Sequence, residues 1–190
     1  DAYGEQIALY RRALAEAVFG LINPSGKLTI SYPVHVGQQP VFYSQVRGQH
    51  GDRYADLTQE PLFPFGHGLS YTHYQYSNLR INTRVLSRGQ SARVNIHVET
   101  LGGRAGAGIV QVYLRDMVTS VTWVNKALKS YARVHLEPGE KKTVNFTLPW
   151  EAFSIVDAEG RSVVEAGEFE ILAGPSSRDA DLLRANLWVE

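Results

Sequence analysis

The chain has 190 residues, of which 44% are hydrophobic and 20% charged, so it can bury the core of one domain or of a domain plus part of another. Nineteen basic residues balance nineteen acidic ones, which excludes the electropositive surface that binds nucleic acid or an anionic membrane. No apolar run approaches the roughly 20 residues that cross a bilayer, and the lack of cysteine excludes disulfides and thiolate sites. The compartment stays open between cytoplasm, periplasm and secretion.

A helix is expected over residues 5–19, where apolar side chains recur at steps of three and four. Glu5, Arg12 and Glu16 fall on the opposite face, and Gly20 supplies a C-terminal stop. The helix therefore presents one apolar face that something else has to cover.

A turn at residues 23–26 leads to an expected strand over residues 27–32, which Pro33 ends. One helix and one strand cannot form a domain. Each large apolar side chain contributes about 1.5–3 kcal/mol when buried, whereas ordering each backbone residue costs about 1–2 kcal/mol. We interpret residues 1–33 as the C-terminal remnant of an α/β sandwich domain that lies on the rest of that domain or on a partner.

Residues 34–72 are rich in glycine, proline and aromatic residues and show little periodicity. Their aromatic content predicts an ordered linker that lies on neighbouring surfaces. Gly66 and Gly68 are expected to take positive φ in a tight turn. This turn should bury three aromatic side chains on one surface, those of Phe63, Phe65 and Tyr71.

From residue 73 to residue 190 the pattern is that of short strands with one buried and one wet face. Period-two alternation covers residues 93–98, 110–115, 143–148 and 168–171. Turn signals lie between these runs, and Pro138–Gly139 is interpreted as a hairpin-type turn. The prediction is a mainly β chain whose largest part is an immunoglobulin-like sandwich, of the fibronectin III variety because the Cys–Trp–Cys hallmark is absent.

Several motifs occur in an order that matches a known family. They lie at residues 23–28, 32–33, 37–43, 61–72, 121–122, 126–131, 138–140 and 165–169. With these motifs the chain resembles the C-terminal portion of a glycoside hydrolase of family 3: the end of its second, α/β domain, its linker, and its fibronectin III-like domain. His67 and Ser130–Tyr131 depart from the residues more usual in the family.

The resemblance implies a parent enzyme of β-glucosidase type, which hydrolyses terminal β-linked sugars by a retaining mechanism with two carboxylates. The motifs of the family's nucleophile and acid/base do not occur here, so no catalytic residue is assigned and no cofactor is expected. The chain is expected to brace the catalytic domains and to be inactive alone. Its implied partners are those domains, on the same or a separate chain, and the parent's carbohydrate substrate; a homodimer through the first helix stays open.

The linker holds one cluster of charged residues, at Asp52, Arg53, Asp56 and Glu60, with His50 beside it. A functional interpretation places Asp52, Arg53 and Asp56 at the edge of the parent's active-site cleft. A solvated, ion-paired loop is the favoured alternative, since charged surface loops are common. No metal site is expected, because the spacing is unspecific and implies no third ligand.

Three aromatic residues raise a second function, a stand-alone carbohydrate- or protein-binding module. Trp123, Tyr131 and Trp150 could stack on sugar rings, although packing in the core or at an interface is the favoured interpretation. The glycine run at residues 102–108 precedes a strand, so it is interpreted as a loop between strands and not as a phosphate-binding loop. The sequence does not define sugar specificity.

Overall fold

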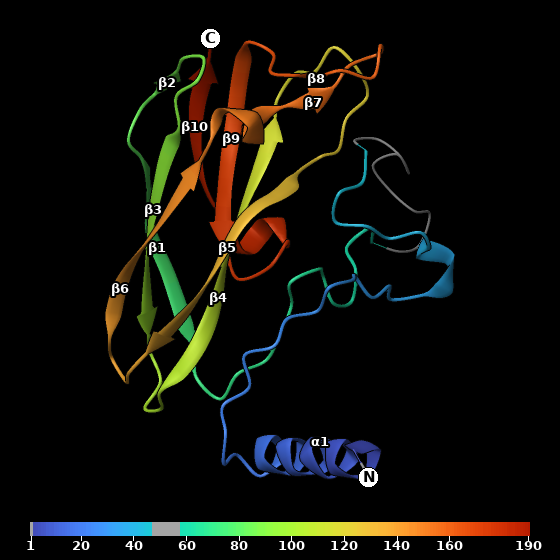
Figure 1. The fold of residues 1–190 in the computed structure, drawn as a ribbon, viewed down its shortest axis with the longest axis vertical. Helices are drawn as coiled ribbons and strands as arrows, with labels where there is room; N and C mark the ends of the chain where they lie inside the picture. Colours follow the sequence, from blue (N-terminus) through green and yellow to red (C-terminus); the bar gives the residue numbers. More distant parts are fainter. Residues whose placement is uncertain (1, 47–57) are drawn as a thin grey trace.

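The computed structural model describes residues 2–46 and 58–190. A two-sheet β-sandwich forms the bulk of the described chain, and helix α1 (Ala2–Val18) stands apart from it near the N-terminus (Figure 1). Between them runs a segment with little regular structure, containing one short helical turn, η1 (Val36–Gln38). We call residues 23–46 and 58–72 the strap.

The sandwich consists of a three-stranded and a five-stranded sheet. The first has the order β1 (Tyr74–Ile81), β3 (Ala92–Thr100), β6 (Lys141–Leu148), with antiparallel pairing. The second has the order β2 (Val85–Leu86), β10 (Leu183–Val189), β9 (Gly167–Gly174), β4 (Gly106–Asp116), β5 (Ala127–Leu136). All its pairs are antiparallel except β2 with β10.

Smaller elements lie before and after β9 in the chain. A hairpin joins β7 (Ile155–Val156) to β8 (Ser162–Val163), and two short helical turns are η2 (Trp150–Phe153) and η3 (Asp179–Asp181). No helix in the described part of the chain is long and apolar enough to span a membrane.

The core lies between the two sheets, where alternate side chains of facing strands meet. Val94, Ile96 and Val98 of β3 and Val110 and Val112 of β4 have no exposed surface. The expected mainly β, fibronectin III-like fold is thus confirmed, because strands with period-two alternation bury one face against each other.

Two local predictions about turns were wrong. The turn at residues 137–140 does form, with a hydrogen bond from the Glu140 amide to the Glu137 carbonyl and a positive φ of 72° at Gly139. However, it joins β5 to β6, which belong to different sheets, so it is a crossover between layers and not a hairpin. The glycine run is only partly a loop, since residues 106–108 belong to β4.

The expected strand over residues 27–32 is not formed. Leu28 exchanges hydrogen bonds with His67 and Gly66, and Tyr32 forms an isolated bridge with Phe63. The segment therefore pairs with the second half of the strap instead of with a sheet. A ladder needs neighbouring strands, and the described chain offers none at this point.

The core predicts a sharp difference between two aliphatic truncations. Ile96→Ala removes a fully buried side chain and should lower the free energy of unfolding by about 2–5 kcal/mol. Val118→Ala, at a side chain that is 80% exposed, should change it by no more than about 0.5 kcal/mol. Chemical denaturation measures both values, and similar losses in the two variants would contradict the assigned core.

Candidate functional site

The outer face of the five-stranded sheet is covered by the strap, although alternation in β4 predicted a wet face there. Gln111 is 3% exposed and Tyr113 is fully buried, and Arg115 is buried beside them. Glu170 of β9, also expected on a wet face, is buried as well. The prediction was wrong because alternation identifies the face toward the second sheet but not a covering supplied from elsewhere in the chain.

Aromatic contacts hold the strap to this face. The Tyr43 and Phe65 rings stack with centroids 4.3 Å apart, and Tyr43 meets the buried Tyr113 edge-on at 5.8 Å. Leu172 and Leu182 complete this small second core. Such pairs contribute about 0.5–1.5 kcal/mol each beyond the area that they bury.

The side chain of Gln111 links three segments at the centre of the contact. Its amide nitrogen donates to the Gly66 carbonyl at 3.2 Å and to the Pro175 carbonyl at 2.7 Å, and its carbonyl oxygen accepts from the Tyr113 hydroxyl. The Ser177 amide donates to the Phe65 carbonyl at 2.9 Å. Because buried polar groups are costly when unpaired, this network specifies one position of the strap.

The prediction of positive φ in the strap was correct for Gly66 and wrong for Gly68. Gly66 has a positive φ of 79°, as predicted, and a Cβ there would lie 2.2 Å from the Gln111 oxygen. Gly68 does not have positive φ; it is required because a Cβ would lie 2.3 Å from the Gly26 carbonyl oxygen. The expected shared burial also fails, because Phe63 and Tyr71 are 41% and 49% exposed.

A network of charges fixes the loop before β10 beside the strap. Arg115 pairs with Glu170 at 2.7 Å and with Asp179 at 3.0 Å, and Lys126 pairs with Asp179 at 2.5 Å and donates to the Ser177 carbonyl at 2.6 Å. Burial by itself raises the pKa of Asp179, but the hydrogen bonds and positive charges of Lys126 and Arg115 outweigh it, so the pKa lies below its ordinary value.

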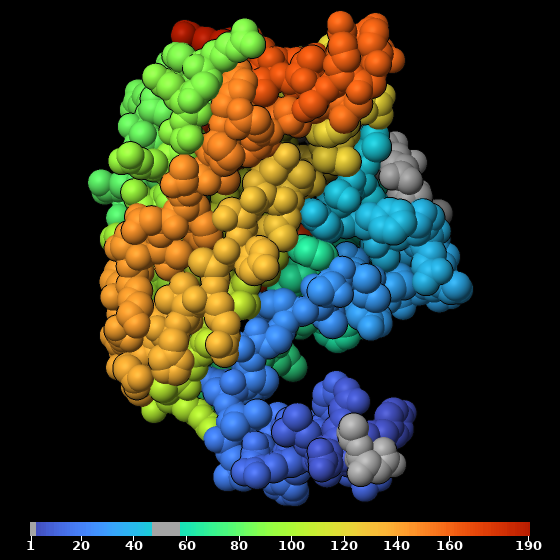
Figure 2. Space-filling model, in the orientation of Figure 1, coloured from blue at the N-terminus to red at the C-terminus, as the bar shows by residue number. Residues whose placement is uncertain are grey.

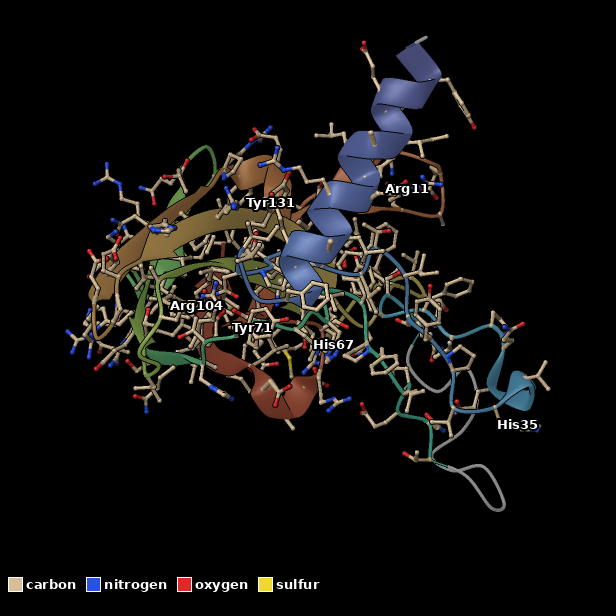
Figure 3. All side chains as sticks on the ribbon, turned by 90° about the horizontal axis from the view of Figure 1, so that it is seen from below. Arg11, His35, His67, Tyr71, Arg104 and Tyr131 are labelled. Carbon is tan, nitrogen blue, oxygen red and sulfur yellow. The ribbon has the colours of Figure 1, made fainter. Side chains whose placement is uncertain are left out.

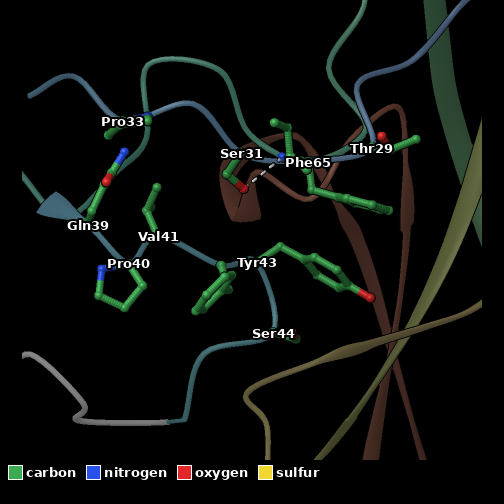
Figure 4. Close-up of a pocket in the computed structure, with 11 residues that line it drawn as sticks. Thr29, Ser31, Pro33, Gln39, Pro40, Val41, Tyr43, Ser44 and Phe65 are labelled. Carbon is green, nitrogen blue, oxygen red and sulfur yellow. Dashed lines mark hydrogen bonds between the residues drawn. The ribbon is translucent and has the colours of Figure 1, made fainter. Parts of the chain in front are cut away.

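A hollow of about 670 Å³ opens in the first segment of the strap, between residues 29–33 and 39–44, with Phe65 beside them (Figure 4). Ile30, Val41, Phe42 and Phe65 are among its mainly apolar walls, and the Ser31 hydroxyl accepts a hydrogen bond from the Phe65 amide. Among the described residues, no carboxylate, histidine or lysine lines this hollow. These walls suit apolar side chains of a partner.

Helix α1 and the strap expose large apolar side chains, including two that line the hollow, Ile30 and Phe42. We call this set the docking surface: Tyr10, Leu14, Val18, Phe19, Leu21, Ile30, Tyr32, Phe42, Leu62, Phe63 and Leu69. Leu14 and Phe19 are 67% and 81% exposed. An open hollow separates α1 from the strap (Figure 2).

The residues predicted for a site have different outcomes. Asp52, Arg53 and Asp56, with His50, lie outside the described residues, and Glu60 is exposed on the strap. Within the described ranges, no three histidine, aspartate or glutamate side chains gather into a group that could hold a metal ion.

The three aromatic candidates also separate. Trp150 packs against the sandwich core and Trp123 is partly buried, whereas Tyr131 is 68% exposed on β5. Sequence reasoning missed the roles of Gln111, Arg115 and Asp179. The available signal was weak: hydrophilic residues in one strand and in the loop before β10, without any pattern that pairs them with the strap.

Two protein-family models match this chain. Residues 108–177 match the fibronectin type III-like domain, and residues 9–71 match the glycosyl hydrolase family 3 C-terminal domain. A solved β-glucosidase involved in saponin metabolism from intestinal bacteria is 48% identical, with a TM-score of 0.89 over 94% of this chain and 24% of that one. A β-glucosidase from Listeria innocua in complex with isofagomine is 34% identical, with a TM-score of 0.84 over 94% of this chain and 26% of that one.

Curated relatives agree. Thermostable beta-glucosidase B of Acetivibrio thermocellus is 42% identical over 180 residues, which are 88% of this chain and 24% of the relative. A beta-xylosidase of Formosa agariphila is 40% identical over 185 residues, 94% of this chain and 25% of the relative. The chain belongs to glycoside hydrolase family 3, of whose enzymes it corresponds to the C-terminal portion, and it spans about a quarter of the length of these relatives.

The contact between Gly66 and Gln111 predicts unequal effects of two alanine substitutions. Gly66→Ala and Gly89→Ala both place a side chain at a φ near 78–79°, but a Cβ at Gly89 meets nothing within 4 Å. Both should lose about 1–2 kcal/mol of unfolding free energy from the backbone conformation, and Gly66→Ala about 1–3 kcal/mol more from overpacking. Equal losses in chemical denaturation would show that the strap is not seated on Gln111.

The ion network predicts a pH-dependent contribution of Asp179. Since its folded-state pKa is lowered, its carboxylate stabilises the fold above the unfolded value of about 3.9, and this stabilisation is lost as the pH falls through the folded-state pKa. The free energy of unfolding of the unsubstituted chain should therefore exceed that of the Asp179→Asn variant at pH 7, and this difference should shrink below about pH 4. Asp157 and Glu140, whose pKa values are also lowered, occur in both chains and cancel. A gap independent of pH would refute the ion pairs.

Proposed function

We propose that this chain is the non-catalytic support of a β-glucosidase-type exo-glycosidase, and that its docking surface binds the enzyme's catalytic domains. The observation that carries the proposal is the exposure of the apolar face of α1: the side chains of Tyr10, Leu14 and Val18 are about two-thirds exposed. A 17-residue helix is only marginally stable in water without packing of its apolar face. The relatives, about four times longer than the segment that they share with this chain, supply domains that could cover it.

The size of the exposed surface supports a stable contact. Fully burying one large apolar side chain is worth about 1.5–3 kcal/mol, and the docking surface holds several on α1 and on the strap. The strap can hold its exposed apolar side chains in fixed positions because Gln111 and the Tyr43–Phe65 stack fix it to the sandwich. On this proposal the sandwich braces the catalytic domains through the strap.

The described carboxylates support a non-catalytic role. A retaining glycosidase needs two carboxyl groups about 5–5.5 Å apart that are free to reach the sugar. The buried Glu170 and the partly buried Asp179 are instead committed to Arg115 and Lys126. The nucleophile, the acid/base and the subsites for the sugar would therefore belong to the catalytic domains. Contact of Asp52, Arg53 and Asp56 with the edge of that cleft remains a prediction.

Reconstitution tests the proposal. The catalytic region of the Acetivibrio thermocellus relative, prepared without the segment that matches this chain, would be mixed with this chain and assayed with an aryl β-glucoside. Neither piece should hydrolyse it alone, whereas the mixture should. Phe19→Glu should weaken the association by about tenfold or more because it buries a charge.

A matched control separates this effect from a general one. Val118→Glu places the same charge at an equally exposed position outside the docking surface, and it should leave association unchanged. Hydrolysis by this chain alone, or equal association of both glutamate variants, would overturn the proposal. Self-association that Phe19→Glu abolishes would indicate instead a homodimer through α1.

One observation favours a second candidate function, carbohydrate binding. Tyr131 lines a groove of about 370 Å³ together with Arg133, Ser25 and Lys27, so an exposed ring stands beside polar groups that can bind hydroxyls. Titration with cello-oligosaccharides by calorimetry tests it: a saturable heat that Tyr131→Ala abolishes and Trp188→Ala leaves unchanged would support it. The absence of binding heat from the unsubstituted chain would exclude this function for the groove.

A further inference from the structure

Two side chains from distant segments hold the C-terminal end of α1 (Figure 3). The Tyr71 hydroxyl lies 2.6 Å from the Ala17 carbonyl oxygen, to which it donates, and 3.3 Å from that of Val18. An Arg104 Nη2 donates to the Gly20 carbonyl, and its guanidinium lies 5.4 Å from the centre of the Tyr71 ring. Tyr71 belongs to the strap and Arg104 to the connection between β3 and β4.

The helix end needs these donors. Gly20, with a positive φ of 72°, donates to the Ala17 carbonyl, and the Leu21 amide donates to Glu16 at 2.7 Å. This is the usual hydrogen-bond pattern at a glycine-terminated helix, and it satisfies the Glu16 and Ala17 carbonyls. Tyr71 adds a second donor to Ala17 and reaches Val18, and Arg104 supplies the donor for Gly20. α1 has no basic residue in its last turn. Arg104 therefore supplies, from the sandwich, the cation that the negative end of the helix dipole favours.

A third side chain joins the same three segments. The Asn23 side chain donates to the Ala105 carbonyl at 3.1 Å, and its oxygen accepts from the Ser70 hydroxyl at 2.8 Å and from the Tyr71 amide at 2.9 Å. Asn23 thus connects the chain leaving α1, the end of the strap and the β3–β4 connection. Its three interactions use both ends of one rigid amide, which fixes the geometry of the junction.

The glycine run explains how this junction can be so close. A Cβ at Gly106 would lie 2.3 Å from the Asn23 amide nitrogen, so a larger residue would push Asn23 away from Ala105. Within the glycine run, Gly106 therefore leaves the space that the Asn23 side chain occupies.

We propose that Asn23, Tyr71 and Arg104 form a clasp that fixes the direction of α1 relative to the sandwich. The clasp concerns this chain alone; only the identity of what α1 carries rests on the proposed function. Because the apolar face of α1 is exposed and not packed on the sandwich, polar contacts at its end set its direction. A domain bound to α1 would then be aligned with the sandwich through these three residues.

Distance measurement on the whole chain tests the clasp directly. The chain contains no cysteine, so Leu9→Cys on α1 and Thr143→Cys on β6 provide two unique positions for spin labels. Pulsed electron paramagnetic resonance should give one narrow distance distribution in the otherwise unchanged chain. Arg104→Ala and Asn23→Ala should broaden this distribution. Arg104→Lys, which keeps a cationic donor, should give a width between those of the unsubstituted residue and Arg104→Ala.

Arg88→Ala is the matched control, because Arg88 is exposed in the turn between β2 and β3. It should leave the distribution unchanged. A broad distance distribution in the chain that carries only the two labels, or distributions of equal width for Arg104→Ala and Arg88→Ala, would overturn the clasp. These results involve no catalytic domain, so they leave the reconstitution test independent.

Hydrogen exchange gives a second readout that does not depend on the labels. The amides of Phe19, Leu21 and Ile22, which bond back to α1, should exchange about tenfold faster in Arg104→Ala, as expected for losing one charge-assisted hydrogen bond. Tyr71→Phe, which keeps the ring beneath the guanidinium, should have a smaller effect. Amides of β3 and β4 should not change in either variant; unchanged exchange at residues 19–22 would count against the clasp.

Discussion

The structure depends on one interaction, the hydrogen bonding of the buried Gln111 amide to the strap. The amide joins the Gly66 carbonyl to the sandwich at the centre of a sheet face that would otherwise be exposed to water. Tyr43 and Phe65 add apolar contact around it, and Ser177 adds a backbone bond. Without the strap the buried Gln111 amide would keep Pro175 and Tyr113 as partners but lose the Gly66 carbonyl, and leaving such a group short of a partner is costly, so the strap and this face stabilise each other.

This constraint divides the strap into two sides with different chemistry. The side toward the sandwich carries matched hydrogen bonds and stacked rings, and the other side leaves side chains such as Leu62, Phe63 and Leu69 exposed. A linker without an anchored inner side would lose conformational entropy when a partner bound its outer side. Here that entropy has already been lost in folding, so the strap presents a preorganised surface. This suits a support for larger domains better than it suits a flexible tether.

Sequence alone predicted the sandwich well because its core follows from local alternation. Val94, Ile96 and Val98 are buried as their period-two spacing requires. The same rule failed for Gln111, Tyr113 and Arg115, since alternation carries no information about a segment that folds back over the second face. The strand expected over residues 27–32 failed for a related reason: β propensity becomes a ladder only where partner strands exist, and this segment meets the strap instead.

The candidate site was predictable in part. The aromatic composition of the linker indicated an ordered segment, and the need for positive φ at Gly66 follows from a glycine between bulky residues. The partner of each group could not be inferred, because Gly66 and Gln111 are 45 residues apart and nothing local relates them. Similarly, Asn23 looked like a turn residue, and its bond to Ala105, 82 residues away, exists only in three dimensions.

Hydrogen exchange of this chain, alone and bound to the catalytic region of a family relative, tests the central claim most directly. The account predicts that binding slows exchange in α1 and in the strap segments around Tyr32 and Phe63, where the exposed docking surface would become covered, while β3 and β4 exchange at unchanged rates. Unchanged exchange in α1 and the strap, with slowing confined to the sandwich strands, would contradict it.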